Sequence, residues 1–163
     1  MTVDAVQLQR RLRQALQQGD HAAAIVCLQQ AAELAQQAGD QAAEGRHLGN
    51  LALLYHRLQR PADALACLER ALSLVRAGGD RVAEDGLLGN MGNILREQGR
   101  FAEAITYLNQ ALLLAQEMGD LRGRGIWLSN LGLVYDDLGQ PEQAVDYFTQ
   151  AVSAARQLRD QRG

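Results

Sequence analysis

The stretch HLGNLALLYHRLQRPADALACLERAL, residues 47–72, occurs in three related copies along the chain. The other two are LLGNMGNILREQGRFAEAITYLNQAL, residues 87–112, and WLSNLGLVYDDLGQPEQAVDYFTQAV, residues 127–152. The copies begin forty residues apart and keep Asn, Gly and Ala in fixed places, whereas their charged residues vary. Self-similarity at a fixed period indicates a repeat architecture in which each copy is one supersecondary unit. We therefore expect the fixed residues to build a scaffold and the variable residues to face a partner.

Gly-Asp pairs mark the boundaries between the repeats. They occur at residues 19–20, 39–40, 79–80 and 119–120, and Arg-Asp takes this place at residues 159–160. These marks predict four repeats, 1–40, 41–80, 81–120 and 121–160, each made of two helices of about 17–18 residues. Arginine and glutamine crowd residues 10–18. We therefore expect the first helix of repeat 1–40 to be degenerate and to act as a polar N-terminal cap.

Small and large residues alternate along one face of each second helix. The small columns are Ala24, Ala64, Ala104 and Ala144, and Ala31, Ala71, Ala111 and Ala151, with Leu28, Leu68, Leu108 and Phe148 between them. Spacings of four and three residues put these columns on one helical face. In the first helices, Ala52, Gly92 and Gly132 share a column within a leucine-rich stripe. Glycine inside a helix costs roughly 1 kcal/mol, which is acceptable where a neighbouring backbone comes close.

The composition is typical of one soluble helical domain. The chain has 163 residues, of which 47% are hydrophobic and 21% charged, and its net charge is -3. That charge is too small to indicate binding to nucleic acid or to an acidic membrane. No apolar run approaches the roughly 20 residues that a membrane span requires. Cys27 and Cys67 lie one repeat apart, too distant for a disulfide, so we expect free thiols and a cytoplasmic location.

No catalytic or metal-binding pattern stands out in the sequence. The three histidines, His21, His47 and His56, occupy different columns, and the two cysteines are forty residues apart, whereas zinc needs clustered ligands. The chain has no lysine, so it cannot form the usual phosphate-binding loop. The RGRG of residues 122–125 is too short a basic segment to indicate an RNA site. We expect no enzyme, no cofactor and no metal.

The spacing of small and large residues, with Asn at positions 50, 90 and 130, resembles a tetratricopeptide repeat. The forty-residue length, the Gly-Asp pairs between repeats and the NLG or NMGN of the first helices look like the Pins-type, or Leu-Gly-Asn repeat, subclass. The resemblance covers essentially the whole chain. It implies an all-α fold, a right-handed α-solenoid of antiparallel helix pairs in about four 40-residue units. Period and helicity alone also remain compatible with HEAT-like helix pairs.

In tetratricopeptide arrays the first helices line a concave groove, and the resemblance assigns groove positions to this chain. They are Arg46, Asn50, Leu53 and Arg57, then Gly86, Asn90, Asn93 and Glu97, then Ile126, Asn130, Leu133 and Asp137. The implied function is a scaffold that holds a peptide or helix of a partner protein. The amides of Asn50, Asn90 and Asn130 can donate and accept hydrogen bonds, and so can grip a peptide backbone. Alternatively, they bond to neighbouring backbone groups of the scaffold itself.

The charges at the ends of the first helices change along the chain. They read His56-Arg57, then Arg96-Glu97, then Asp136-Asp137, from basic through mixed to acidic. One hypothesis is that this gradient orients a ligand, with its acidic end near Arg46 and Arg57 and its basic end near Asp137. The alternative is an ordinary solvated surface, because exposed ion pairs contribute little individually.

The last predicted helix is not followed by a polar capping helix. It carries Val145, Phe148 and Val152, and a stacked array normally ends in a polar cap. We expect either that the chain is part of a longer array or that this face packs against another molecule, and the second possibility makes a homo-oligomerisation module the alternative function. The sequence identifies neither the partner nor the oligomeric state, and it does not distinguish an extended from a helical ligand.

Overall fold

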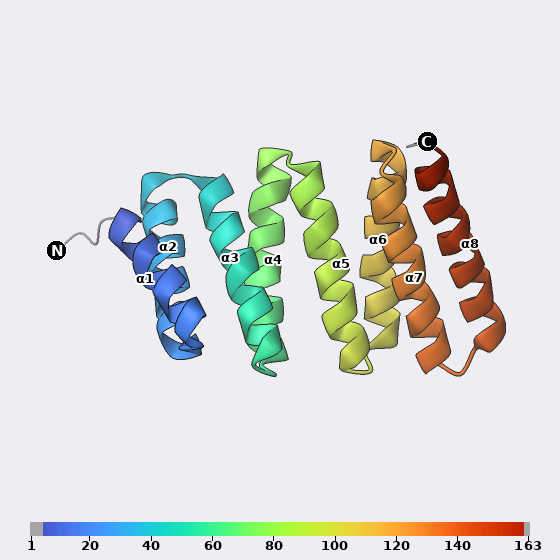
Figure 1. Ribbon diagram of the computed structural model, residues 1–163, viewed down its shortest axis with the longest axis horizontal. Coiled ribbons are helices and arrows are strands. Elements are labelled where there is room, and N and C mark those ends of the chain that lie inside the picture. The colour runs from blue at the N-terminus through green and yellow to red at the C-terminus, as the bar shows by residue number, and fades with distance from the viewer. Residues whose placement is uncertain (1–4, 162–163) are drawn as a thin grey trace. The chain divides into compact units, whose positions relative to one another are not determined.

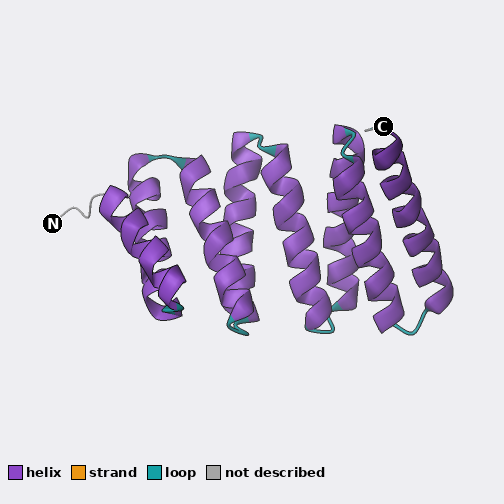
Figure 2. Cartoon of the chain, in the orientation of Figure 1, coloured by secondary structure: helices purple, strands orange, loops and turns teal. Residues whose placement is uncertain are grey.

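The computed structural model describes residues 5–161, and these residues form eight α-helices and no strand (Figures 1 and 2). The helices are α1 Ala5–Gln18, α2 His21–Ala38, α3 Gln41–Arg57, α4 Pro61–Gly78, α5 Arg81–Glu97, α6 Phe101–Met118, α7 Leu121–Asp137 and α8 Pro141–Asp160. From α3 onward each helix start recurs forty residues later. The predicted all-α class is confirmed.

The helices group into two compact units. Residues up to 80 carry α1–α4 and form unit 1, and residues from 81 carry α5–α8 and form unit 2. Within each unit every helix packs against the next one along the chain, and in unit 2 the first helices α5 and α7 also contact each other. Each unit thus contains two helix pairs in sequence order (Figure 1).

The predicted seam of small residues lies in the core of both units. Ala64 and Ala104 have no exposed surface, and Leu68 and Leu108 are likewise fully buried. A Cβ atom at Gly92 would lie 2.6 Å from Leu108 Cγ, which is closer than real Cβ contacts come. The column of small residues is therefore explained by the close approach of the two helices in a pair, as the sequence predicted.

Phe148 belongs to this seam rather than to the outer face of α8. A Cβ at Gly132 would lie 2.6 Å from Phe148 Cε1, so the ring packs on the glycine of α7, and the side chain is half-buried. Val145 and Val152, which the sequence analysis grouped with it, are 61% and 50% exposed. The three residues are only three and four positions apart, but the ring turns toward α7 because Gly132 leaves room for it.

Capping side chains define the helix starts and glycines define the ends. The carboxylates of Asp20, Asp40 and Asp120 accept hydrogen bonds from backbone N–H groups in the first turns of α2, α3 and α7 at 2.9–3.0 Å. The left-handed Gly39 and Gly119 close α2 and α6 with φ of 72° and 69°. Pro61 and Pro141 begin α4 and α8, where their missing N–H group costs no hydrogen bond.

The first helix is shorter than the other first helices and carries exposed arginines. α1 is a 14-residue helix, shorter than the 17 residues of α3, and it packs on α2 with Leu8 and Ala15 buried to 3% and 4% exposure. Its arginines are exposed. Leu8, Leu12 and Ala15 have the i, i+4, i+7 spacing of a packed helix face, so α1 combines apolar packing on one side with arginines on the other.

One turn lacks the glycine that the other turns have. Gln59 has a φ of 57°, and its repeat equivalents are Gly99 and Gly139, with φ of 71° and 69°. A left-handed conformation costs a non-glycine residue roughly 1–2 kcal/mol. We expect Gln59→Gly to raise the free energy of unfolding by about 1 kcal/mol, after the larger backbone entropy of glycine is subtracted. Urea denaturation followed by circular dichroism measures the change.

The reciprocal substitution serves as the control. Gly99→Gln places a side chain in the same backbone conformation in unit 2 and should lower the unfolding free energy by a similar amount. A Gln59→Gly variant that is less stable than the parent chain would contradict this account of the turn.

Candidate functional site

The groove positions predicted for unit 1 form one strip on α3. Arg46, Asn50, Leu53 and Arg57 are all exposed, and Leu53 keeps 46% of its surface in solvent. Their spacings of four, three and four residues align them along one side of the helix. The opposite side of α3 buries Leu48 and Leu51 in the unit core.

Unit 2 contributes two neighbouring first helices. On α5, Asn90 and Asn93 are half-buried and Glu97 is exposed. On α7, Asn130 is half-buried, Leu133 is 39% exposed and Asp137 is exposed. Because α5 and α7 contact each other, this unit carries two such rows on adjacent helices. We call the strip on α3 and the rows on α5 and α7 the first-helix face of their respective units.

The contact that joins α5 to α7 was not predicted from the sequence. Trp127 Nε1 donates hydrogen bonds to both carboxylate oxygens of Asp85, at 2.8 and 3.0 Å. The indole ring lies against Gly89, where a Cβ atom would come within 2.1 Å of Trp127 Cη2. Both partners are buried, with Trp127 8% and Asp85 6% exposed. The contact fixes α7 on α5 and so sets the spacing between the two rows.

A signal for this contact is present in the sequence. Trp127 is the single tryptophan of the chain and takes the column of His47 and Leu87. Asp85 takes the column of two glycines, Gly45 and Gly125. Trp127 and Asp85 each differ from the residues at the equivalent positions of the other repeats. The two differences belong together, because a buried indole N–H needs a hydrogen-bond acceptor and Asp85 provides it.

Burial shifts the pKa of the Asp85 carboxyl. Loss of solvent raises the pKa of Asp85 above its usual range, while the hydrogen bonds from Trp127 act in the opposite direction, and Asp120 raises the pKa further. Its carboxylate oxygens are both engaged by the indole. Asp85 therefore serves as an anchor for α7 rather than as an exposed acidic group.

A second link between α5 and α7 changes the interpretation of the charge gradient. Arg96 Nη1 donates to Asp137 Oδ2 at 2.6 Å. The side chain of Asp137, the predicted acidic end of the groove, is thus in contact with the arginine of the mixed pair. A hydrogen-bonded pair of opposite charges has a much weaker field than an isolated carboxylate. Asp137 is therefore not the isolated anionic anchor that the gradient hypothesis needs.

The outer part of α8 presents apolar surface. Beside the exposed Val145 and Val152, a pocket of about 500 Å³ lies between α7 and α8, and Phe148, Ile126 and Leu158 line it. The residues that line this pocket have equivalents forty residues earlier in the chain, on α5 and α6. Those are the two helices against which α7 packs.

Residues 5–161 were also compared with the requirements of a metal site and of a membrane span, and they meet neither. In that range no group of three or more His, Cys, Asp or Glu side chains is arranged to hold a metal ion. The helices described there also include none with the length and apolar character needed to cross a membrane. Cys27 is buried and Cys67 half-buried, and both are free thiols.

Comparison with known proteins identifies the architecture. A family model for the tetratricopeptide repeat matches residues 13–77 and 85–157. BtubC (BKLC) from P. vanneervenii has a similar crystal structure, with a TM-score of 0.83 and 16% sequence identity over 95% of this chain and 64% of its own. A signal transduction ATPase with a tetratricopeptide repeat sensor from Pyrococcus horikoshii has a TM-score of 0.84 and 21% identity over 99% of this chain and 26% of its own.

A third similar structure is that of a Rap protein complexed with Competence and Sporulation Factor. Its TM-score is 0.74 and its identity 18%, over 94% of this chain and 43% of that protein. The chain thus spans less than two thirds of each of these three proteins. No sequence relative was found among curated proteins. At these identities the likenesses show the fold, and they confirm the predicted tetratricopeptide-like α-solenoid class.

Two glycines of α5 provide a test of the Trp127 contact. We expect Gly89→Ala to lower the free energy of unfolding by about 1–3 kcal/mol, because the new methyl group overlaps the indole ring. Gly86→Ala is the matched control in the same helix, since a Cβ there meets nothing within 4 Å. The control should stabilise the helix by roughly 0.5–1 kcal/mol.

Chemical denaturation measures both changes, and the fluorescence of Trp127 reports whether the indole stays buried. Equal effects of the two substitutions would show that the close contact between α5 and α7 is not formed.

Proposed function

The chain belongs to the tetratricopeptide repeat family, and we propose that it is a protein-interaction scaffold whose first-helix face binds a peptide or a helix of a partner protein. The observation that carries the proposal is the combination of amide and apolar side chains at the surface of these helices. Asn50 and Leu53 occur together on α3, and Asn130 and Leu133 occur together on α7. Both leucines keep more than a third of their surface exposed.

The chemistry of this face suits a peptide. Each asparagine amide offers two donors and an acceptor, which can pair with the N–H and C=O groups of a bound backbone. The exposed Leu53 and Leu133 offer apolar contacts to side chains of the ligand, and burying them in a complex is favourable by roughly 25 cal/mol per Å². On α3, Arg46 and Arg57 flank this pair and favour an acidic ligand.

The related structures support the same class of function. The Rap protein of similar fold is complexed with Competence and Sporulation Factor. The tetratricopeptide repeat is generally a non-enzymatic scaffold, and this agrees with a binding role for the chain. The proposal includes a cytoplasmic location, because Cys27 and Cys67 are free thiols.

A displayed peptide library tests the proposal. The parent chain should select peptides that share a consensus, and Asn50→Ala should weaken their binding if unit 1 holds them. Asn90→Ala with Asn130→Ala should weaken it if unit 2 does. Each lost backbone hydrogen bond should lower the affinity by about fivefold to tenfold. Calorimetric titration of a selected peptide measures the change.

Asn109→Ala, on the second helix α6, is the control because it lies outside the first-helix face. The proposal is wrong if no peptide is selected, or if all the asparagine variants bind a selected peptide as tightly as the parent chain does.

We propose homo-oligomerisation through α8 as a second candidate function, because this helix leaves apolar side chains in solvent. Val145 is 61% and Val152 is 50% exposed, and the pocket between α7 and α8 adjoins Val152. If α8 of one copy packed against α8 of another, the contact would cover Val145, Val152 and the pocket. Its occupant would be the α8 face of a second copy, in an isologous dimer.

Replacing the two valines tests this candidate. Val145→Gln with Val152→Gln should convert a concentration-dependent dimer into a monomer, and stability should be almost unchanged because both side chains are exposed. Leu113→Gln, at a 57% exposed position on α6, is the matched control and should leave the dimer intact. Sedimentation over a range of concentrations measures the mass. A monomeric parent chain, or a variant of unchanged mass, would contradict self-association through α8.

A further inference from the structure

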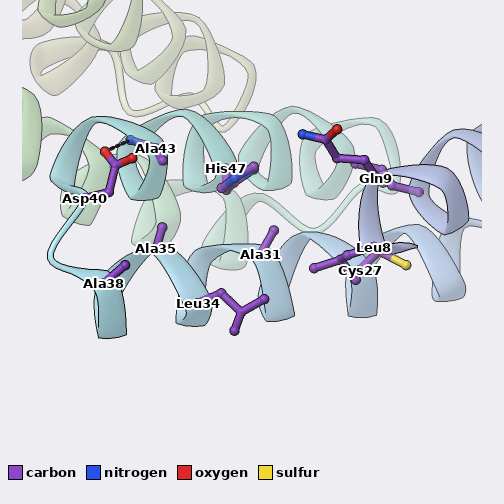
Figure 3. Close-up of a pocket in the computed structure, with 11 residues that line it drawn as sticks. Leu8, Gln9, Cys27, Ala31, Leu34, Ala35, Ala38, Asp40, Ala43 and His47 are labelled. Carbon is purple, nitrogen blue, oxygen red and sulfur yellow. Dashed lines mark hydrogen bonds between the residues drawn. The ribbon is translucent and has the colours of Figure 1, made fainter. Parts of the chain in front are cut away.

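Unit 1 contains a half-open apolar pocket of about 240 Å³ between α1, α2 and α3. Figure 3 shows the side chains around it, with Leu8 and Gln9 on α1, Cys27 and Leu34 on α2 and His47 on α3. Leu8 and Cys27 are buried, whereas Gln9 is exposed at the edge of the pocket. Most of the lining is aliphatic, so the pocket favours an apolar occupant.

The repeats show what fills the equivalent place in unit 2. The helices α5, α6 and α7 correspond to α1, α2 and α3, eighty residues earlier, and Trp127 corresponds to His47. In unit 2 the indole of Trp127 lies on α5, against Gly89 and Asp85. A second lining residue is also smaller in unit 1, because Cys27 takes the column of Tyr107. Two aromatic side chains of unit 2 are thus replaced in unit 1 by an imidazole and a thiol.

The size of the pocket agrees with an aromatic occupant. An apolar protein cavity of about 150 Å³ binds benzene, which has six heavy atoms. Scaled by volume, a pocket of 240 Å³ holds a planar molecule of about nine or ten heavy atoms, which is the size of a bicyclic aromatic ring.

Polar groups at the pocket can orient such a ring. Burial, together with the neighbouring positive charge of Arg46, lowers the pKa of His47 below its usual range, whereas Asp40 acts in the opposite direction. The imidazole is therefore neutral at pH 7 and has one nitrogen that can accept a hydrogen bond. The amide of Gln9 offers a second acceptor on the α1 side (Figure 3). In unit 2 the equivalent role of acceptor falls to Asp85.

We propose that this pocket binds a small planar aromatic molecule of indole size that carries a ring N–H group. The ring lies between α1 and α3 and contacts Leu8, Cys27 and His47, as the indole of Trp127 lies between α5 and α7 in unit 2. Binding joins α1 to α3 and stabilises unit 1, because a ligand that binds only the folded state raises its stability. This small-molecule site is separate from the peptide function proposed for the first-helix face.

Indole itself is the first probe. Indole is titrated into the full chain and followed by nuclear magnetic resonance. It should shift the resonances of the imidazole ring protons of His47 more than those of His56. It should also raise the melting temperature of the chain. His47→Trp with Gln9→Gly reproduces two residues of unit 2, Trp127 and Gly89, at the equivalent positions and should fill the pocket. This variant should melt at a higher temperature than the parent chain and bind indole at least about tenfold more weakly.

Two controls keep the test decisive. Leu113→Trp adds a tryptophan on the exposed surface of α6 and should leave indole binding unchanged. Ala31→Leu places extra volume at another lining position and should also weaken binding, which covers the case in which the double variant does not fold.

The proposal is wrong if the parent chain does not bind indole. It is also wrong if the folded variants with a larger side chain in the pocket bind indole as tightly as the parent chain does. A third arm uses peptides that contain tryptophan. If such peptides shift His47 and free indole does not, the pocket receives an aromatic side chain of a partner, and the small-molecule proposal is wrong. Loss of peptide binding in the asparagine variants, with indole binding retained, would separate this site from the first-helix face.

Discussion

The close approach of the two helices in each pair is the constraint on which the rest of the structure depends. It requires residues without bulk, and Ala64 and Ala104 supply them with no exposed surface. At Gly92 even a methyl group would overlap Leu108. Because interiors are close-packed, such a contact fixes the rotation of a helix about its axis as well as its distance from the partner. The rotation then decides which side chains face outward, and so it exposes Asn50 and Leu53 together.

The parts of the fold that could be predicted from the sequence are those in which every repeat does the same thing. The seam, the helix starts at Pro61 and Pro141, and the left-handed Gly39 and Gly119 recur in register and depend on interactions within one or two helical turns. In α1 the polar residues obscure the spacing of Leu8 and Ala15, so the packing of this helix is harder to predict from its sequence. Propensity counts all residues of a helix, whereas packing depends on one face.

The candidate site stays a prediction. Its groove residues on α3 are exposed, whereas Asn90, Asn93 and Asn130 are half-buried. The link between α5 and α7 was missed because it arises where two columns depart from the repeat at once, Trp127 in one and Asp85 in the other. Aligning the repeats shows which residues are equivalent, but it does not show which of the non-matching residues contact each other in space. The pair of Arg96 and Asp137 was missed for the same reason.

These departures suggest how a repeated scaffold acquires different sites. One column holds His47 in unit 1 and Trp127 in unit 2, and the helices at both places keep the same bounds within their repeats. A change of size there leaves the seam intact, because the seam lies on another face of the helix. In unit 2 the large residue fills the space between first helices and ties them together. In unit 1 the smaller residue lines an apolar pocket. The same column thus holds a link between two helices in unit 2 and part of a pocket lining in unit 1, while the contacts that define the fold remain the same.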